Sequence, residues 1–196
     1  MKINPDKTEI LLFYPPELHN EVLIKGVLFE DQCIRFSECV KNVGVYLDKN
    51  LNMNTHINHV TSFCYKILKD VGSVKKNLEK SHLESVVHSV VSSLLDYCNC
   101  LFLNLSKENL FKLQKVQNSA ARLILGRRRR ESARDALRTL HWLNIESRVM
   151  FKTILIVFKV LRGSCSDNIK LTYKTFNGRA GDFLLLETPS FKTKYG

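Results

Sequence analysis

The stretch that decides the fold is residues 81–130, which read SHLESVVHSVVSSLLDYCNCLFLNLSKENLFKLQKVQNSAARLILGRRRR. Apolar residues recur at steps of three and four through its first part, which predicts an amphipathic helix over 81–102. Ser81 stands where an N-cap belongs, and Glu84 follows three residues later, which is the capping-box pattern. The sequence therefore predicts that this helix begins at Ser81.

A second amphipathic helix is predicted over Lys107–Leu125. Ser106 is a favourable N-cap, and Gly126 fits the position just past the C-terminus. The apolar arc of this helix holds Leu110, Leu113, Val116, Ala120, Leu123 and Ile124. The opposite arc holds Lys112, Lys115, Ser119 and Arg122. Gln117 falls inside the apolar arc, where a buried amide needs hydrogen-bond partners.

Positive charge is concentrated in the same region. The chain of 196 residues has a net charge of +11. Residues 107–162 hold 14 Lys and Arg against 4 Asp and Glu, whereas residues 1–106 hold 11 against 12. A cationic excess confined to one helical region is typical of a surface that binds a polyanion.

The candidate nucleic-acid-binding residues are the cations of this region. They are Lys112, Lys115, Arg122, Arg127, Arg128, Arg129, Arg130, Arg148, Lys152 and Lys159. The arginine block, 127–130, is a candidate for phosphate contacts, but it also fits a nuclear-import patch or a solvated charge run between helices. For the three cations of the second helix, the alternative is a solvated helix face.

The rest of the chain predicts an α+β fold. Residues 1–50 favour three or four short strands in one small N-terminal antiparallel β-sheet, and helical spacing begins at Asn54. The apolar runs that predict these strands are 8–13, 22–29, 33–36 and 43–47. A short helix capped by Ser132 is expected to end at Leu140. A long helix follows over 145–161, and its nearly continuous apolar surface is expected to be buried apart from one basic stripe.

The expected division is a β segment over 1–52, a mostly helical bundle over 53–165 and a loop-rich tail over 166–196. Within that tail, 178–181 is expected to be loop and 183–186 is expected to form an isolated strand. The N-terminus lacks an apolar h-region, and no apolar run approaches the ~20 residues that span a bilayer. We therefore expect an intracellular protein of the nucleus or cytoplasm that is not secreted and has no membrane partner.

Metal and cofactor signatures are weak. The six cysteines form no C-x-x-C pair, so reduced and mostly buried thiols are expected. His56 and His59 with Cys64 lack a fourth ligand at the spacing that zinc sites use. The sequence has no Gly-x-Ser-x-Gly elbow and no Gly-rich phosphate loop. We expect no metal site, no cofactor and no catalytic residue.

Five segments carry a family resemblance. They are Asn4–Glu9 with Ile10–Phe13, Asn42–Asp48 with Leu51 and His56-Ile57, Leu95–Asn99, Leu113–Arg122 and Leu140–Leu143. In this order and spacing they resemble the C-terminal part of a reverse transcriptase from a non-LTR (LINE-type) retrotransposon. The resemblance covers roughly residues 2–165 and implies the end of a palm, a thumb-like helical domain and a downstream extension.

The resemblance also implies a catalytically incomplete remnant. In this family the metal-binding aspartates lie upstream of the segment that Asn4–Glu9 matches, and this sequence has no adjacent pair of aspartates. Polymerase chemistry needs two divalent ions held by carboxylates. We therefore expect no enzyme activity, and an open reading frame that starts inside the ancestral polymerase domain.

A thumb holds its duplex by the backbone, so the resemblance implies sequence-independent binding of RNA, DNA or a hybrid. Two alternatives stay open at this point. One is that the chain is an inert truncated remnant. The other is that it is a protein-interaction module without a nucleic-acid role, because loss of the palm would expose apolar faces. A palm-containing fragment acting in trans is a further candidate partner.

Overall fold

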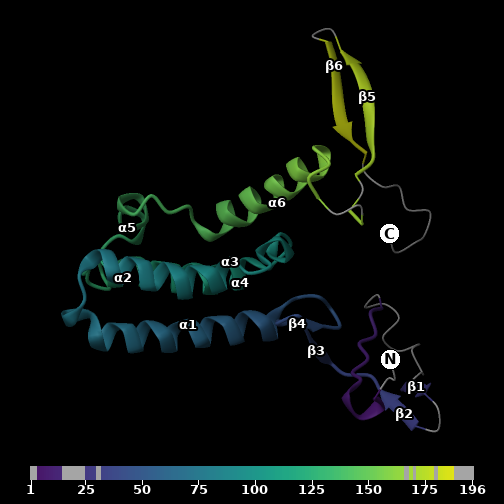
Figure 1. Ribbon diagram of the computed structural model, residues 1–196, viewed down its shortest axis with the longest axis horizontal. Helices are drawn as coiled ribbons and strands as arrows, with labels where there is room; N and C mark the ends of the chain where they lie inside the picture. The colour runs from purple at the N-terminus through teal and green to yellow at the C-terminus, as the bar shows by residue number, and fades with distance from the viewer. Residues whose placement is uncertain are drawn as a thin grey trace. The chain divides into compact units, whose positions relative to one another are not determined.

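Short strands come first in the chain and helices follow, as the computed structural model in Figure 1 shows. The structure describes residues 4–14, 25–29, 32–165, 168–169, 171–178 and 181–187. The α+β class is confirmed. The chain divides into two compact units, Met1–Val149 and Met150–Gly196. The domain divisions expected after residues 52 and 165 stay predictions.

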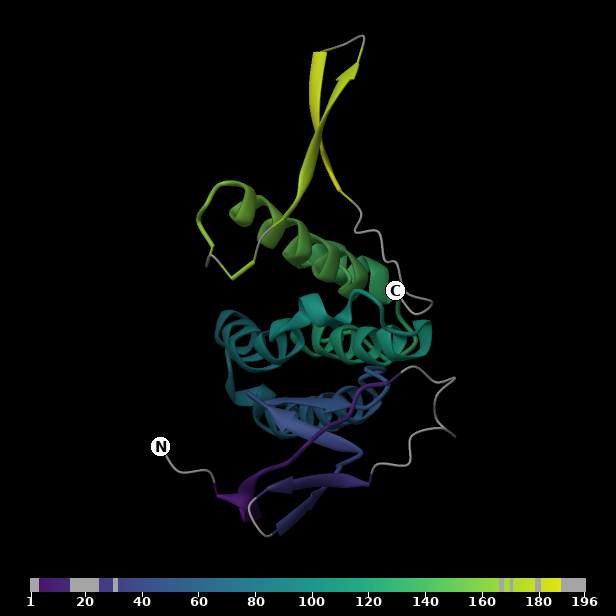
Figure 2. The same ribbon diagram turned by 90° about the vertical axis from the view of Figure 1, so that its right-hand side faces the viewer.

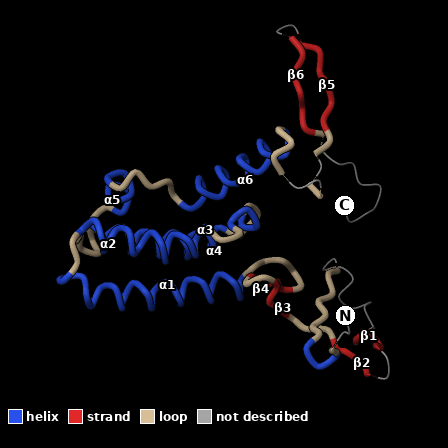
Figure 3. Tube along the Cα trace, in the orientation of Figure 1, coloured by secondary structure: helices blue, strands red, loops and turns tan. Residues whose placement is uncertain are grey.

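The predicted sheet is two separate hairpins, drawn in red in Figure 3. β1 (Gly26–Phe29) pairs antiparallel with β2 (Gln32–Arg35), and β3 (Cys39–Asn42) pairs antiparallel with β4 (Val45–Asp48). The predicted strand at 8–13 is wrong, since Ile10 makes only an isolated bridge to Phe36.

The predicted last strand was placed two residues too early. Val43 and Gly44 both have positive φ, 45° and 83°, as in the type I′ turn that joins two-residue hairpins. This turn pairs Asn42 with Val45 and makes a strand of 39–42, which has little apolar alternation of its own. Turn geometry, rather than strand pattern, therefore defines this hairpin.

Helices build the core of the first unit. They are α1 (Asn54–Val74), α2 (Lys80–Val87), α3 (Ser93–Asp96), α4 (Lys107–Leu125), α5 (Ala133–Thr139) and the start of α6 (Ile145–Leu161). Short 3₁₀ turns lie at Pro5–Lys7, Lys75–Asn77 and Asn99–Phe102. α4 packs along α1 and contacts α2 and α5, and α1 also packs on β4 (Figures 1 and 2).

The first helix of the deciding stretch differs from its prediction at the start. α2 begins at Lys80 with Glu79 at its N-cap position and no side-chain cap, so the predicted capping box at Ser81 is wrong. Ser81 lies in the first turn, where its carbonyl accepts a hydrogen bond from the Ser85 hydroxyl at 3.0 Å. The apolar stripe, rather than a cap, sets where this helix lies.

A π-helical turn at His88–Ser92 interrupts this helix. The buried residues on either side of it are spaced by four: Leu83, Val87, Val91 and Leu95. Each step of four residues drifts by about 40° around a straight α-helix. A π-helical turn holds more residues and takes up that drift. The turn therefore keeps all four side chains in the core.

The helix also ends earlier than 102, because tertiary contacts displace the chain after Asp96. Tyr97 leaves helical geometry, with ψ 120°, and its hydroxyl donates to the Val43 carbonyl at 2.7 Å. Cys98 follows with a positive φ of 51°. A 3₁₀ turn then carries Phe102 into the core, where it is fully buried.

α4 is confirmed from end to end. The Ser106 hydroxyl accepts a hydrogen bond from the Asn109 amide at 3.3 Å, as an N-cap does. Gly126 ends the helix with φ 68°, and the Arg127 amide donates back to the Arg122 carbonyl at 2.9 Å, which is a Schellman motif. The Lys75 ammonium donates to the Leu123 carbonyl at 2.6 Å and places a cation at the negative helix end.

The amide of Gln117 has the partners that its buried position requires. Its Nε2 donates to the Leu143 carbonyl at 2.8 Å, and its Oε1 accepts from Gln114 Nε2 at 2.9 Å. Gln114 Oε1 in turn accepts from the Ile145 amide at 2.9 Å. Two glutamine side chains thus join α4 to the segment that leads into α6.

In the second unit, the prediction of a helix buried on most sides is wrong. Only Ile145 and Val149, both in the first unit, are buried in α6. Exposed apolar side chains follow at Met150, Phe151, Ile154, Phe158 and Leu161. An apolar pattern predicts which face of a helix is hydrophobic, but it does not predict whether another element covers that face.

The C-terminal strand is also paired rather than isolated. β5 (Tyr173–Gly178) and β6 (Gly181–Leu186) form an antiparallel hairpin. The segment Gly178–Gly181, predicted as loop, contributes one residue to the end of each strand.

Two glycines give a matched stability prediction. Gly126→Ala is expected to lower the free energy of unfolding by about 1–2 kcal/mol, because its φ of 68° strains any residue with a Cβ. Gly72→Ala is expected to raise it by about 0.5–1 kcal/mol, since Gly72 lies inside α1 and a Cβ there meets only Leu123 Cδ1 at 3.7 Å. Urea unfolding measures both. A rise in the free energy of unfolding for Gly126→Ala would contradict the assigned end of α4.

Candidate nucleic-acid interface

The outer face of α4 carries cations whose partners differ. Lys112 is engaged, because its ammonium pairs with Glu108 at 3.1 Å and donates to Asn58 Oδ1 on α1 at 3.3 Å. Lys115 is exposed, and its ammonium lies 4.4 Å from the centre of the Phe111 ring. Phe111 itself is 57% exposed. An uncovered aromatic ring beside a cation suits contact with a nucleotide.

The turn between α4 and α5 is held in place by Glu131. The Arg122 guanidinium donates twice to the Glu131 carbonyl, at 3.2 Å and 3.0 Å. The Glu131 carboxylate accepts from the Arg128 amide at 2.7 Å. On the other side, the Arg127 guanidinium donates to the Thr139 hydroxyl of α5 at 3.2 Å. The arginine block therefore sits on a fixed turn.

This turn closes one end of an open hollow of about 740 Å³, called the basic hollow here. Its lining residues come from α1, α4 and the turn: Tyr65, Phe111, Lys115, Asn118, Ser119, Arg122, Leu123, Arg127 and Arg129. Four of them are cationic, and none of these described lining residues is acidic. Arg128 and Arg130 are exposed but do not line it. The structure thus brings together Lys115, Arg122, Arg127 and Arg129.

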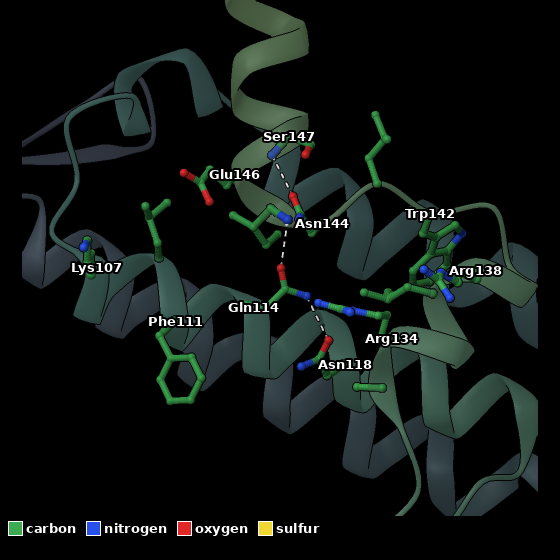
Figure 4. A pocket seen from close by; sticks show the side chains of 15 residues that line it. Lys107, Phe111, Gln114, Asn118, Arg134, Arg138, Trp142, Asn144, Glu146 and Ser147 are labelled. Carbon is green, nitrogen blue, oxygen red and sulfur yellow. Dashed lines mark hydrogen bonds between the residues drawn. The ribbon is translucent and has the colours of Figure 1, made fainter.

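A second hollow of about 610 Å³ lies next to the first along α4, toward α5 and the start of α6 (Figure 4). It is called the tryptophan hollow here, because Trp142 lines it. Phe111 and Asn118 line both hollows. The two hollows therefore adjoin along the outer face of α4.

Sequence reasoning missed four residues that line these hollows. Tyr65 and Phe111 are exposed aromatic residues. Phe111 is four residues before Lys115 on the predicted helix, which was a signal for their contact, whereas Tyr65 comes from another helix and no sequence pattern places it there. Arg134 and Arg138 line the tryptophan hollow from α5. Their spacing of four residues on the helix capped by Ser132 was a signal that could have found them.

Arg148 has a structural partner. Its Nε donates to Asp96 Oδ1 at 2.9 Å, and its second nitrogen pairs with Asp96 Oδ2. Both side chains are largely buried, with 18% and 24% exposed. Asp96 also accepts from Asn99 Nδ2 at 3.3 Å. This two-point ion pair fastens the first turns of α6 to α3, so Arg148 is not free to meet a phosphate.

Lys152 and Lys159 belong to the second unit and are both exposed. The interface described here is built from the first unit alone, so these two residues stay predictions.

The histidines and cysteines take structural positions. Among the described residues, no group of three or more metal-ligating side chains comes together. His56 is buried, and its Nδ1 accepts from the Tyr46 amide at 3.5 Å. Burial, with His59 nearby, lowers the pKa of His56 and favours its neutral form. All six cysteines are free, but only Cys64 is buried, so the prediction of mostly buried thiols is wrong. Burial raises the pKa of Cys64 to about 11.

Comparison with known protein families finds no match, and comparisons with curated proteins and with solved structures find none either. Within the described parts of the chain, every helix is too short or too polar to cross a bilayer.

The Arg148–Asp96 pair yields a prediction that separates stability from binding. Arg148→Ala is expected to cost about 1–3 kcal/mol of unfolding free energy, because it leaves a largely buried carboxylate without its charged donor. A double-mutant cycle with Asp96→Ala isolates the coupling. Nucleic-acid affinity of the folded variant should change little. A large loss of affinity without a loss of stability would return Arg148 to the interface.

Proposed function

We propose that this chain binds nucleic acid without sequence preference, through the outer face of α4 and the basic hollow beside it. The observation that carries the proposal is the convergence of Lys115, Arg122, Arg127 and Arg129 on one hollow that also exposes Tyr65 and Phe111. Cations that neutralise phosphates supply affinity without reading sequence. Exposed aromatic rings stack on bases of any type.

The fixed turn supports this assignment. The side chains of a solvated charge run need no fixed partners. Here the guanidinium of Arg122 is hydrogen-bonded to the Glu131 carbonyl, and that of Arg127 to the Thr139 hydroxyl. Each of these two guanidinium groups retains further N–H donors beyond those hydrogen bonds. Pre-positioned cations lose less side-chain entropy when a phosphate arrives, so they bind it more tightly than free ones.

The proposal includes the origin that the resemblance implies: a reverse-transcriptase remnant whose thumb-like helices hold RNA, DNA or a hybrid duplex. Synthesis by this chain alone is not proposed, because the sequence has no adjacent pair of aspartates to hold two catalytic metal ions. The nucleus or the cytoplasm stays the expected location.

The arginine block contains its own matched control. Arg127→Ala with Arg129→Ala is expected to reduce the slope of log K against log salt by about 2 on duplex DNA, since each lost phosphate contact removes about 0.9. Arg128→Ala with Arg130→Ala removes the same charge from outside the hollow and should reduce the slope by less than about 1. Fluorescence anisotropy across a salt series measures both.

Equal slopes for the two double variants would remove the basic hollow from the binding surface. The same titrations on two unrelated duplex sequences test the lack of sequence preference. A large difference in affinity between them would contradict backbone recognition.

A second candidate function is favoured by the exposed apolar residues of α6. Ile154 and Phe158 are 58% and 50% exposed, and such surfaces recruit protein partners or self-associate. A palm-containing fragment is one such partner. If the surface drives association, the full chain should elute early in size-exclusion chromatography, and Ile154→Glu with Phe158→Glu should restore the elution of a monomer. Identical elution of both proteins as monomers at high concentration would reject self-association through α6.

A further inference from the structure

The tryptophan hollow is an open hollow with the volume of a ligand site. Its volume of about 610 Å³ falls within the range of about 300–1,000 Å³ that small-molecule sites occupy. Figure 4 shows side chains from α4, from α5 and from the segment before α6 around it. All of them belong to the first unit.

The indole of Trp142 is held in position at this hollow. The Trp142 amide donates to the Leu137 carbonyl at 2.9 Å. The side chain is half-buried and packs against Ala121, Ala136 and Leu137. The side chain is therefore held against the core while it still lines the hollow. A fixed indole is a platform on which a flat aromatic ring can stack.

The side-chain amides of Gln114 and Asn118, which line the hollow, are held by hydrogen bonds. Gln114 Nε2 donates to Asn118 Oδ1 at 2.8 Å, and Gln114 Oε1 accepts from the Ile145 amide at 2.9 Å. These bonds leave Asn118 Nδ2 without a hydrogen bond among the described residues. It is a donor available to the edge of a base or to a sugar oxygen.

Cations line the side of the hollow formed by α5. Arg134 and Arg138 lie one helical turn apart and are both exposed. Among the described residues, neither side chain has an ion pair or a hydrogen bond. Lys107 adds a third cation from the start of α4, whereas Glu146 is the single acid in the lining. A phosphate is therefore favoured beside Arg134 and Arg138 and disfavoured beside Glu146.

We propose that the tryptophan hollow holds one unpaired nucleotide of a bound strand, with its base against Trp142 and its phosphate beside Arg134 and Arg138. This inference rests on the proposed function. Phe111 and Asn118 line both hollows, so a strand that leaves the basic hollow meets the tryptophan hollow next. The protein then recognises the junction between a duplex and a single-stranded end, rather than duplex alone.

The test uses the single tryptophan of the chain as its reporter. The full chain is titrated with a blunt duplex, with the same duplex carrying a short single-stranded overhang, and with adenosine monophosphate. The overhang is expected to quench Trp142 fluorescence and to bind about fivefold or more tighter than the blunt duplex, as stacking of one base provides.

Arg134→Ala with Arg138→Ala is expected to reduce this preference, because it removes the proposed phosphate contacts of the unpaired nucleotide, while blunt-duplex binding remains. Both residues are exposed, so the fold should survive. The matched control is Arg35→Ala with Lys41→Ala, which removes two exposed charges from the hairpins and should keep the preference for the overhang.

The remaining outcomes are distinct. Equal affinity for blunt and overhanging duplexes, with unchanged fluorescence, would overturn the nucleotide pocket and leave the proposed function intact. No binding of either duplex at low salt would overturn both. Quenching by adenosine monophosphate without any preference for the overhang would replace the strand by a free nucleotide and so overturn the junction assignment. Displacement of a bound overhang by an acidic peptide, but not by a single strand, would do the same.

Discussion

The burial of one face of α4 is the constraint on which the rest of the structure depends. Leu113, Val116 and Ala120 are at most 1% exposed and hold α4 against its neighbours. Because an α-helix has one buried side, the opposite arc with Phe111 and Lys115 must face outward. Ser106 fixes where this helix starts and Gly126 where it stops, so the arginine block leaves it in a set direction.

Two polar connections of α4 to neighbouring segments form the walls of the two hollows. Gln114 and Gln117 tie α4 to the segment before α6, which builds one wall of the tryptophan hollow. Arg122 and Glu131 tie α4 to the turn before α5, which closes the basic hollow. Arg148 with Asp96 holds the first turns of α6 in the same unit. Side chains of α4 therefore hold a wall of each hollow in place: Gln114 and Gln117 for the tryptophan hollow, and Arg122 for the basic hollow.

How far the sequence predicts this fold depends on whether local or distant contacts decide each element. The ends of α4 and the cap of α5 follow from Ser106, Gly126 and Ser132, which act on their own backbone, and they are confirmed. The end of α3 depends on Tyr97 reaching Val43, a partner 54 residues away, and was mispredicted. The capping box predicted at Ser81 does not form, although the apolar stripe of the same helix is buried. Sequence periodicity does not tell which of these two signals decides where a helix begins.

The candidate site follows the same rule. Charge counts located the cationic region, but not which cations have partners. Lys112 pairs with Glu108, four residues before it on the same helix, and this spacing could have predicted the pair. Arg148 pairs with Asp96, which is distant in the sequence, so only the coordinates show that pair. The aromatic residues Tyr65 and Trp142 reach the interface from other elements, so only the packing of helices brings them there.

The most direct measurement of the central claim is photocrosslinking of the full chain to an overhanging duplex that carries bromouracil in both strands. Mass spectrometry then maps the attached residues. Attachment is expected at Tyr65, Phe111 and Trp142, which line the two hollows beside α4. Attachment chiefly at Phe13, Tyr97 or Phe158, which are at least as exposed as Tyr65 but lie outside these hollows, would contradict it.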